Sequence, residues 1–252
     1  MNRMPLPTQA STQSLTPNFS NEWLGESAFP QAVARRSVTT PHCLFSPVHY
    51  ESGYAYPLIV WLHGPVSNEQ EVSKVLPLIS ARNYVAVAPQ GTESVESVRG
   101  AFGWGDTLEN LMEANERVLH CINAAQQRFN VHPERIFVAG YGEGGTMALR
   151  MGMENPDQFA GAISLGGPIP SGSCLLRRIN EARSLPLLLS VSPDQRYPLD
   201  RVMENVRSLH SYGSSLSLRL YPEGDELTTV MLSDVDRWVM EKVCAAPSSV
   251  AS

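Results

Sequence analysis

Residues 135–150 combine a short apolar run, a glycine-rich turn and a second apolar segment, and they constrain the fold more than any other stretch. The run 136–139 is β-branched and apolar, which is typical of a buried strand. The segment 146–154 is rich in Met, Ala and Leu, which favours a helix. A strand, a sharp turn and a helix in direct succession are the building unit of a parallel sheet, so the sequence predicts an α/β protein.

The turn between these two elements has the spacing of a nucleophile elbow, Gly-x-Ser-x-Gly, in which a strained turn presents a serine. Gly140 and Gly144 supply the outer glycines, but the central position is Gly142. Glycine adopts this backbone conformation without the steric cost of a Cβ atom, so Gly142 suits the turn as well as serine does. A generic glycine-rich turn or a phosphate loop is the alternative, although the Gly-Lys-Ser/Thr ending of a phosphate loop is not present.

Strand-like and helix-like patterns alternate along the rest of the chain. Together they predict a doubly wound, mostly parallel sheet with helices on both faces. The expected strands cover residues 43–50, 57–62, 84–88, 136–139, 160–165, 185–191 and 216–221. The expected helices cover residues 67–80, 106–129, 146–154, 199–212 and 229–243.

Several helix boundaries carry recognisable signals. Ser67 and Gln70 have the spacing of a capping box, and Pro77 is expected to break the helix that follows. Residues 90–105 are expected to form a loop, after which Asp106, with Glu109, is expected to cap a long helix. The apolar face of that helix is expected to comprise Leu108, Leu111, Met112, Val118, Leu119, Ile122, Ala125 and Phe129.

The composition separates a globular region from its ends. Residues 1–30 are rich in Ser, Thr, Pro and Asn, which predicts a flexible N-terminal arm. Residues 31–244 are expected to form one α/β domain, and residues 245–252 a disordered tail. The 252-residue chain is 42% hydrophobic and 17% charged, which suits a single large domain with a well-buried core.

Charge and cysteine content exclude several classes of function. The net charge of −6, without a basic stripe, argues against a nucleic-acid partner. No apolar run approaches the ~20 residues of a membrane span, and the N-terminus lacks the apolar core of a signal peptide. The four cysteines are scattered without metal-type spacing, so we expect a reduced, cytoplasmic protein with no metal and no cofactor.

Five stretches together resemble the α/β-hydrolase superfamily, in its carboxylesterase/phospholipase branch, which includes the acyl-protein thioesterases. There is also some likeness to feruloyl esterases and polyhydroxybutyrate depolymerases. The resemblance covers about residues 43–243, in the order of the family. The stretches are Tyr-Pro-Leu-Ile-Val-Trp-Leu-His-Gly (56–64), Val-Ala-Pro-Gln (87–90), the elbow region (132–145), Asn-Pro-Asp-Gln-Phe-Ala-Gly-Ala-Ile-Ser-Leu-Gly-Gly (155–167), and 193–198 with 221–226.

The resemblance implies a Ser-His-Asp triad whose positions can be mapped onto this chain. The serine maps to Gly142, which has no side chain, and the acid maps to Asp194. The histidine maps to Asp225, and no histidine follows position 210. Gly142, Asp194 and Asp225 are therefore interpreted as vestigial positions, and we expect no intact catalytic residue.

The oxyanion-binding groups of the family map onto two further positions. One backbone donor is the residue after the nucleophile, Glu143, and the other is Pro65, which has no N–H. By this mapping, the chain lacks three groups that the family mechanism needs: the nucleophile, the base and one oxyanion donor.

The expected pocket lies at the carboxyl ends of the strands, where ligands bind in open α/β sheets. Its oxyanion region and walls are expected to comprise His63, Gly64, Pro65, Trp104, Tyr141 and Glu143. His63 is expected to hold the end of its strand in place, whereas Trp104 is equally compatible with a pocket wall and with a core plug. Glu143 could join Asp194, Asp225 and Glu223 in an acidic mouth that binds a cation or an amine, or that holds a carboxylate with a raised pKa; alternatively, these carboxylates are simply solvated.

The sequence therefore predicts an α/β-hydrolase-fold protein that has lost serine-hydrolase chemistry. Its function is then binding or regulation, with an unidentified small molecule or protein as its partner. The alternative is an active carboxylic-ester hydrolase, of the esterase, phospholipase or thioesterase type, that uses non-standard residues.

Overall fold

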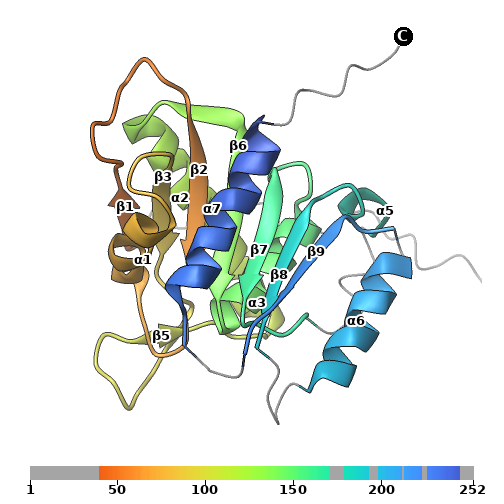
Figure 1. Ribbon diagram of the computed structural model, residues 1–252. Helices are drawn as coiled ribbons and strands as arrows, with labels where there is room; N and C mark the ends of the chain where they lie inside the picture. The colour runs from red at the N-terminus through yellow and green to blue at the C-terminus, as the bar shows by residue number, and fades with distance from the viewer. Residues whose placement is uncertain (1–39, 171–178, 193–197, 212, 223–225, 245–252) are drawn as a thin grey trace, which may run out of the picture. The chain divides into compact units, whose positions relative to one another are not determined.

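The computed structural model describes residues 40–170, 179–192, 198–211, 213–222 and 226–244, all of which lie in one unit, Thr39–Ser252. Strands and helices alternate along them (Figure 1). The strands are β1 (His42–Phe45), β2 (Tyr56–Leu62), β3 (Val85–Pro89), β4 (Glu93–Ser94), β5 (Phe102–Gly103), β6 (Val131–Tyr141), β7 (Gly161–Leu165), β8 (Leu187–Val191) and β9 (Leu216–Leu220). The helices are η1 (Glu69–Glu71), α1 (Val72–Ile79), α2 (Leu108–Arg128), α3 (Glu143–Glu154), α5 (Ile179–Ala182), α6 (Leu199–Ser211) and α7 (Thr229–Cys244).

Seven of the strands form one sheet, in the order β1-β3-β2-β6-β7-β8-β9. Every neighbouring pair is parallel except β1 and β3, which are antiparallel. The central strands β2, β3, β7 and β8 are buried along their whole length, as expected for strands covered on both faces. The predicted fold class, a mostly parallel sheet with helices on both faces, is confirmed.

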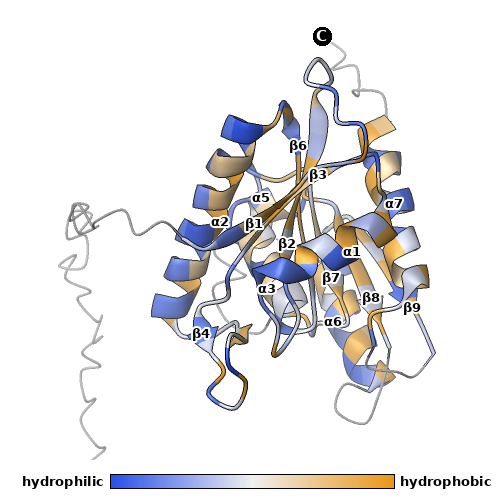
Figure 2. Cartoon of the chain, turned by 90° about the vertical axis from the view of Figure 1, so that its left-hand side faces the viewer, coloured by the Kyte–Doolittle hydropathy of each residue, from blue (hydrophilic) through white to orange (hydrophobic). Residues whose placement is uncertain are grey.

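The two faces of the sheet are covered by different helices, as the edge-on view in Figure 2 shows. Helices α1 and α7 pack on one face, where Leu76 and Trp238 meet the side chains of Ile59, Phe137 and their neighbours. Helices α2 and α3 pack on the other face, and α6 adds Leu209 to the same cluster. Side chains of consecutive strand residues point to opposite faces, which is why β1, β2, β3, β6, β7 and β8 each contribute to both clusters.

Two predictions for the helix expected at residues 67–80, its cap and the break at Pro77, are wrong. Asn68, not Ser67, caps the first turn, because its side chain accepts a hydrogen bond of 3.0 Å from the N–H of Gln70. Ser67 forms an isolated β-bridge with Phe102 instead. The helix also continues through Pro77. Pro77 lies on the exposed face, where water can satisfy the carbonyl that the proline leaves unbonded.

The long helix α2 also begins differently from the prediction. Thr107, not Asp106, is its N-cap, and the Thr107 hydroxyl accepts a hydrogen bond from the N–H of Asn110. Before the helix, the expected loop contains a two-stranded ladder in which β4 and β5 pair antiparallel. This ladder includes Phe102 and Gly103, the two residues just before Trp104.

The apolar face of α2 is narrower than predicted. Leu108, Met112 and Leu119 are exposed, whereas the smaller Ala114 and Cys121 are buried. At 100° per residue, the buried positions form one stripe, and the three exposed side chains lie to one side of it. The predicted face was too wide because it included apolar residues of α2 that point away from the sheet.

Some predictions lie outside the described residues. These are the N-terminal arm at residues 1–30, the tail at residues 245–252, and the acidic positions Asp194, Glu223 and Asp225. Among the described helices, none is both long enough and apolar enough to cross a membrane.

Candidate functional site

The turn between β6 and α3 places Gly142 at the carboxyl edge of the sheet. Gly142 has φ 54° and ψ −122°, and α3 begins at the next residue, three residues earlier than predicted. Its N–H donates to the carbonyl of Leu165 at the end of β7, over 2.8 Å. The N–H of Glu143 has no hydrogen-bond acceptor within the described part of the chain. The backbone of a nucleophile elbow is therefore present, with one donor that is unbonded within the described residues.

The space above Gly142 is filled by Pro65. A Cβ atom on Gly142 would lie 3.0 Å from Cδ and 3.7 Å from Cγ of the Pro65 ring. Contacts of 3.0 Å between carbon atoms are well inside the optimal separation of about 3.5–4.0 Å. The proline therefore removes a backbone donor and also crowds the position of a nucleophilic side chain.

The N–H of Gly64, in the neighbouring turn, is not available to an oxyanion. The N–H of Gly64 donates to the Glu71 carboxylate, at 3.1 Å from Oε1 and 3.3 Å from Oε2. Trp61 Nε1 donates to the same Oε1 over 2.9 Å. Glu71 thus fixes the strand end through two donors, and Gly64 is pressed so closely on the Tyr141 ring that a Cβ atom would lie 2.5 Å from it.

His63 is fully buried, and both of its ring nitrogens are bonded to the backbone. Nε2 accepts from the N–H of Gly91 over 3.0 Å, so the proton is on Nδ1, which donates to the Gly64 carbonyl over 2.9 Å. The indole of Trp104 donates to the His63 carbonyl and its ring lies 5.2 Å from the imidazole. Burial lowers the pKa of His63, against smaller opposing effects of the Gly64 hydrogen bond and nearby glutamates. This geometry favours a structural role over general-base catalysis.

The lowered pKa of His63 predicts a loss of stability in mild acid. The unfolded chain takes up a proton below a pKa of about 6.5, whereas the folded protein keeps the ring neutral, so the free energy of unfolding falls as pH drops. Between pH 7.5 and 5.5, we expect wild type to lose about 1 kcal/mol more than His63→Gln, whose amide can replace both hydrogen bonds. Urea unfolding of both proteins at the two pH values measures this difference, and equal losses would assign the acid sensitivity to other groups.

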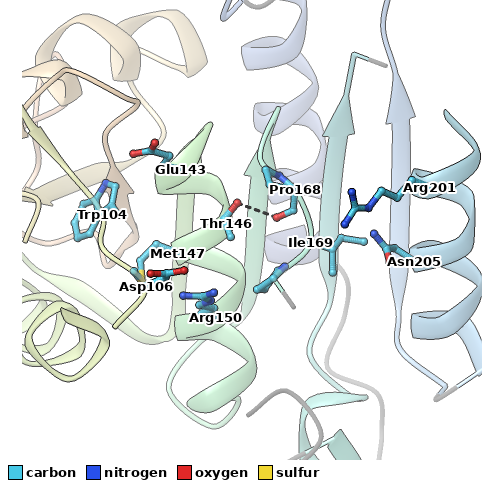
Figure 3. A pocket seen from close by; sticks show the side chains of 11 residues that line it. Trp104, Asp106, Glu143, Thr146, Met147, Arg150, Pro168, Ile169, Arg201 and Asn205 are labelled. Atoms are coloured by element: carbon cyan, nitrogen blue, oxygen red, sulfur yellow. Dashed lines mark hydrogen bonds between the residues drawn. The ribbon is translucent and has the colours of Figure 1, made fainter. Parts of the chain in front are cut away.

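A cavity of about 460 Å³ opens beside the elbow (Figure 3). Trp104, Asp106 and Glu143 lie at one end of it, and Arg201 and Asn205 reach in from α6 at the other. Its remaining lining residues are Thr146, Met147, Arg150, Pro168, Ile169 and Pro170. The Thr146 hydroxyl donates to the Pro168 carbonyl over 2.8 Å, which ties α3 to the loop after β7.

The predicted site residues are therefore placed in two groups. Trp104 and Glu143 line the cavity, and Trp104 is at the same time buried against His63. The second group packs around the turn and comprises His63, Gly64 and Tyr141. Within the described residues, no three His, Cys, Asp or Glu side chains form a group that could hold a metal ion.

Sequence reasoning missed the cavity side of α3 and the contribution of α6. Positions 143, 146, 147 and 150 have the i, i+3, i+4, i+7 spacing of one helix face, so starting the helix at Glu143 places all four side chains together. Arg201 and Asn205 have the same i, i+4 relation on α6. Nothing in the sequence alone indicates that these two helix faces share one cavity.

Comparison with known proteins identifies relatives of this architecture. The family model described as Phospholipase/Carboxylesterase matches residues 47–239. The crystal structure of Arabidopsis thaliana SOBER1 superimposes with a TM-score of 0.63 at 20% identity, over 75% of this chain and 100% of that one. Zea mays acyl-protein thioesterase 2 superimposes with a TM-score of 0.62 at 19% identity, over 81% of this chain and 99% of that one.

A more similar sequence covers a smaller part of the chain. The protein named "Putative esterase NocK", from Nocardia uniformis subsp. tsuyamanensis, is 31% identical over 121 residues, which are 46% of this chain and 34% of that protein. The match therefore spans about one third of that relative's length, and what the whole relative does is not carried over by it.

Proposed function

Because this chain belongs to the phospholipase/carboxylesterase family, we propose that it is a non-catalytic member that binds a small molecule or a protein partner beside the former active site. The observation that carries the proposal is the pairing of Gly142 with Pro65. The nucleophile position has no side chain, and the ring that crowds it comes from the residue that would supply the second oxyanion donor. In this proposal Gly142, Asp194 and Asp225 are the vestigial positions of the triad.

The placement of the histidines supports the same proposal. All six lie in the described residues, and only His63 adjoins the elbow, where its ring nitrogens are already bonded. His120 and His210 lie on α2 and α6, and His132 lies near the amino end of β6. His42 and His49 lie on the edge strand β1 and in the turn that follows it. A general base must come within hydrogen-bonding reach of the nucleophile, and none of these six is so placed in the described structure.

An active carboxylic-ester hydrolase remains the second candidate, and one observation favours it. The elbow backbone is retained and the N–H of Glu143 is unbonded within the described residues, so one of the two oxyanion donors is present. A different nucleophile would then be required. Ser164 is the nearest buried serine of the adjacent strand, but its hydroxyl donates to the Gly167 carbonyl and is fully buried.

We also propose a cytoplasmic location, because the cysteines of the described residues are unpaired. Cys43, Cys121 and Cys244 are free thiols in the described structure. Burial raises the pKa of Cys121 to about 12, so this thiol is unreactive at neutral pH. Unpaired cysteines fit a reducing compartment.

Turnover of p-nitrophenyl butyrate tests the proposed function. We expect a rate equal to that of buffer containing heat-denatured protein, because neither an activated nucleophile nor a base is present. Losing several triad members together leaves little beyond binding. A saturable rate that survives repurification and that Pro65→Leu or Glu143→Pro alters would favour the hydrolase instead.

A further inference from the structure

The cavity beside the elbow combines an apolar floor with two arginine side chains. Met147 is 2% exposed and belongs to the core cluster, against which Ile169 also packs. Arg150, on α3, and Arg201, on α6, both line the cavity from separate helices (Figure 3). The lining therefore offers hydrocarbon contact and two guanidinium groups to a single ligand.

Neither guanidinium has a partner in the described part of the chain. Arg150 and Arg201 form no hydrogen bond and no ion pair there, although Asp106 and Glu143 line the same cavity. Arg150 is half-buried, whereas Arg201, Asp106 and Glu143 are exposed. Water can hydrate the exposed groups freely, but the partly desolvated guanidinium of Arg150, with five unbonded N–H donors, is costly. Among the four charged groups that line the cavity, the one that is partly desolvated and unpaired is thus the positive charge of Arg150.

We propose that the cavity binds an organic anion with an apolar body, namely a carboxylate or a phosphate monoester carried on a hydrocarbon chain or ring. Arg150 and Arg201 bind the anionic group, since a guanidinium matches carboxylate and phosphate oxygens with a planar fork of donors. Met147 and Ile169 contact the apolar body. The proposal rests on the proposed function, because it names the ligand class of the same pocket.

This assignment differs from the acidic mouth that the sequence suggests. An amine would find Asp106 and Glu143 at the Trp104 end of the cavity, but it would also face two unpaired cations. A carboxylate or phosphate removes that unpaired charge and leaves the exposed carboxylates in water. The cavity volume of about 460 Å³ is within the range of small-molecule sites.

Isothermal titration of the full chain with octanoate, octyl phosphate and octylamine, each below its micelle concentration, tests the proposal. We expect octanoate or octyl phosphate to bind and octylamine not to bind. The better of the two anions identifies the headgroup, and inorganic phosphate alone should bind at least tenfold more weakly than octyl phosphate. Arg150→Gln and Arg201→Gln should each weaken binding by about tenfold or more, as expected for the loss of one charged hydrogen-bonding partner.

Arg207→Gln is the matched control, because Arg207 is exposed on the same helix α6 and does not line the cavity. Its affinity for the anion should equal that of wild type. Arg201 is also exposed, so Arg201→Gln keeps the fold even if Arg150→Gln does not. Octylamine binding as tightly as the anions, or anion binding that is unchanged in Arg201→Gln, would overturn the proposal.

Hydrolysis of p-nitrophenyl octanoate by the same proteins separates this inference from the proposed function. Anion binding together with turnover would refute the non-catalytic assignment but keep the anion pocket. Absence of both anion binding and turnover would refute the pocket assignment and leave the non-catalytic assignment standing.

Discussion

Gly144→Ala is expected to destabilise the protein by about 3 kcal/mol or more, because the elbow leaves no room for a methyl group. A Cβ atom at this position would lie 2.3 Å from the carbonyl oxygens of both Leu62 and His63. Both contacts are with backbone at the end of a central strand, which cannot swing aside as a flexible side chain can. The helix α3 would have to move away from β2, and that movement opens the core between them.

Urea unfolding monitored by tryptophan fluorescence measures this effect. Gly53→Ala is the control, because a Cβ atom on Gly53 would meet nothing within 4 Å. Its urea midpoint should match that of wild type or rise slightly, because alanine lowers the conformational entropy of the unfolded chain when the native backbone can accept it. A Gly144→Ala protein as stable as Gly53→Ala would mean that the close approach of α3 to β2 is not what holds the elbow.

Rebuilding the active site should give its largest gain at Pro65. We expect Gly142→Ser with Asp225→His to be a poor esterase, and the triple variant that adds Pro65→Leu to be about 100-fold faster. One oxyanion donor contributes roughly 100- to 1000-fold in rate. Leucine restores the N–H and removes the Cδ atom that would lie 3.0 Å from the new serine Cβ. Initial rates on p-nitrophenyl butyrate measure the ratio.

Pro65→Leu alone is the control for this series. It restores a donor without a nucleophile, so its rate should equal that of wild type. A triple variant no faster than the double variant would show that Pro65 is not the residue that blocks the rebuilt site.

The fold could be predicted from the sequence because its signals are local and strong. The apolar run at Tyr56–Leu62 and the glycine-rich turn at Gly140–Gly144 each indicate an element whatever surrounds it. Helix caps were less certain, since Ser67, Asn68, Asp106 and Thr107 are all good capping residues and tertiary contacts select among them. Ser67, for example, is held in a β-bridge with Phe102 and is unavailable as a cap.

The candidate site was predicted only in part, because some of its features lie within one stretch of sequence and others are contacts between distant stretches. The elbow is contiguous in sequence, so the missing serine and the proline without an N–H can both be identified there. The contact between the Pro65 ring and Gly142, and the bond from Gly64 to Glu71, join residues from different segments. Arg150 and Arg201 line the same cavity because of how α3 and α6 are arranged, and no local sequence pattern encodes that arrangement.

Reaction with a fluorophosphonate, followed by intact mass measurement, tests the loss of serine-hydrolase chemistry most directly. The reagent bonds covalently to an activated serine, whichever segment supplies it, so the test does not depend on where a substitute nucleophile lies. We predict no mass increase in wild type after prolonged incubation with excess reagent, whereas an active serine esterase labelled in parallel is fully modified. A stoichiometric adduct on any serine of this chain would contradict the account.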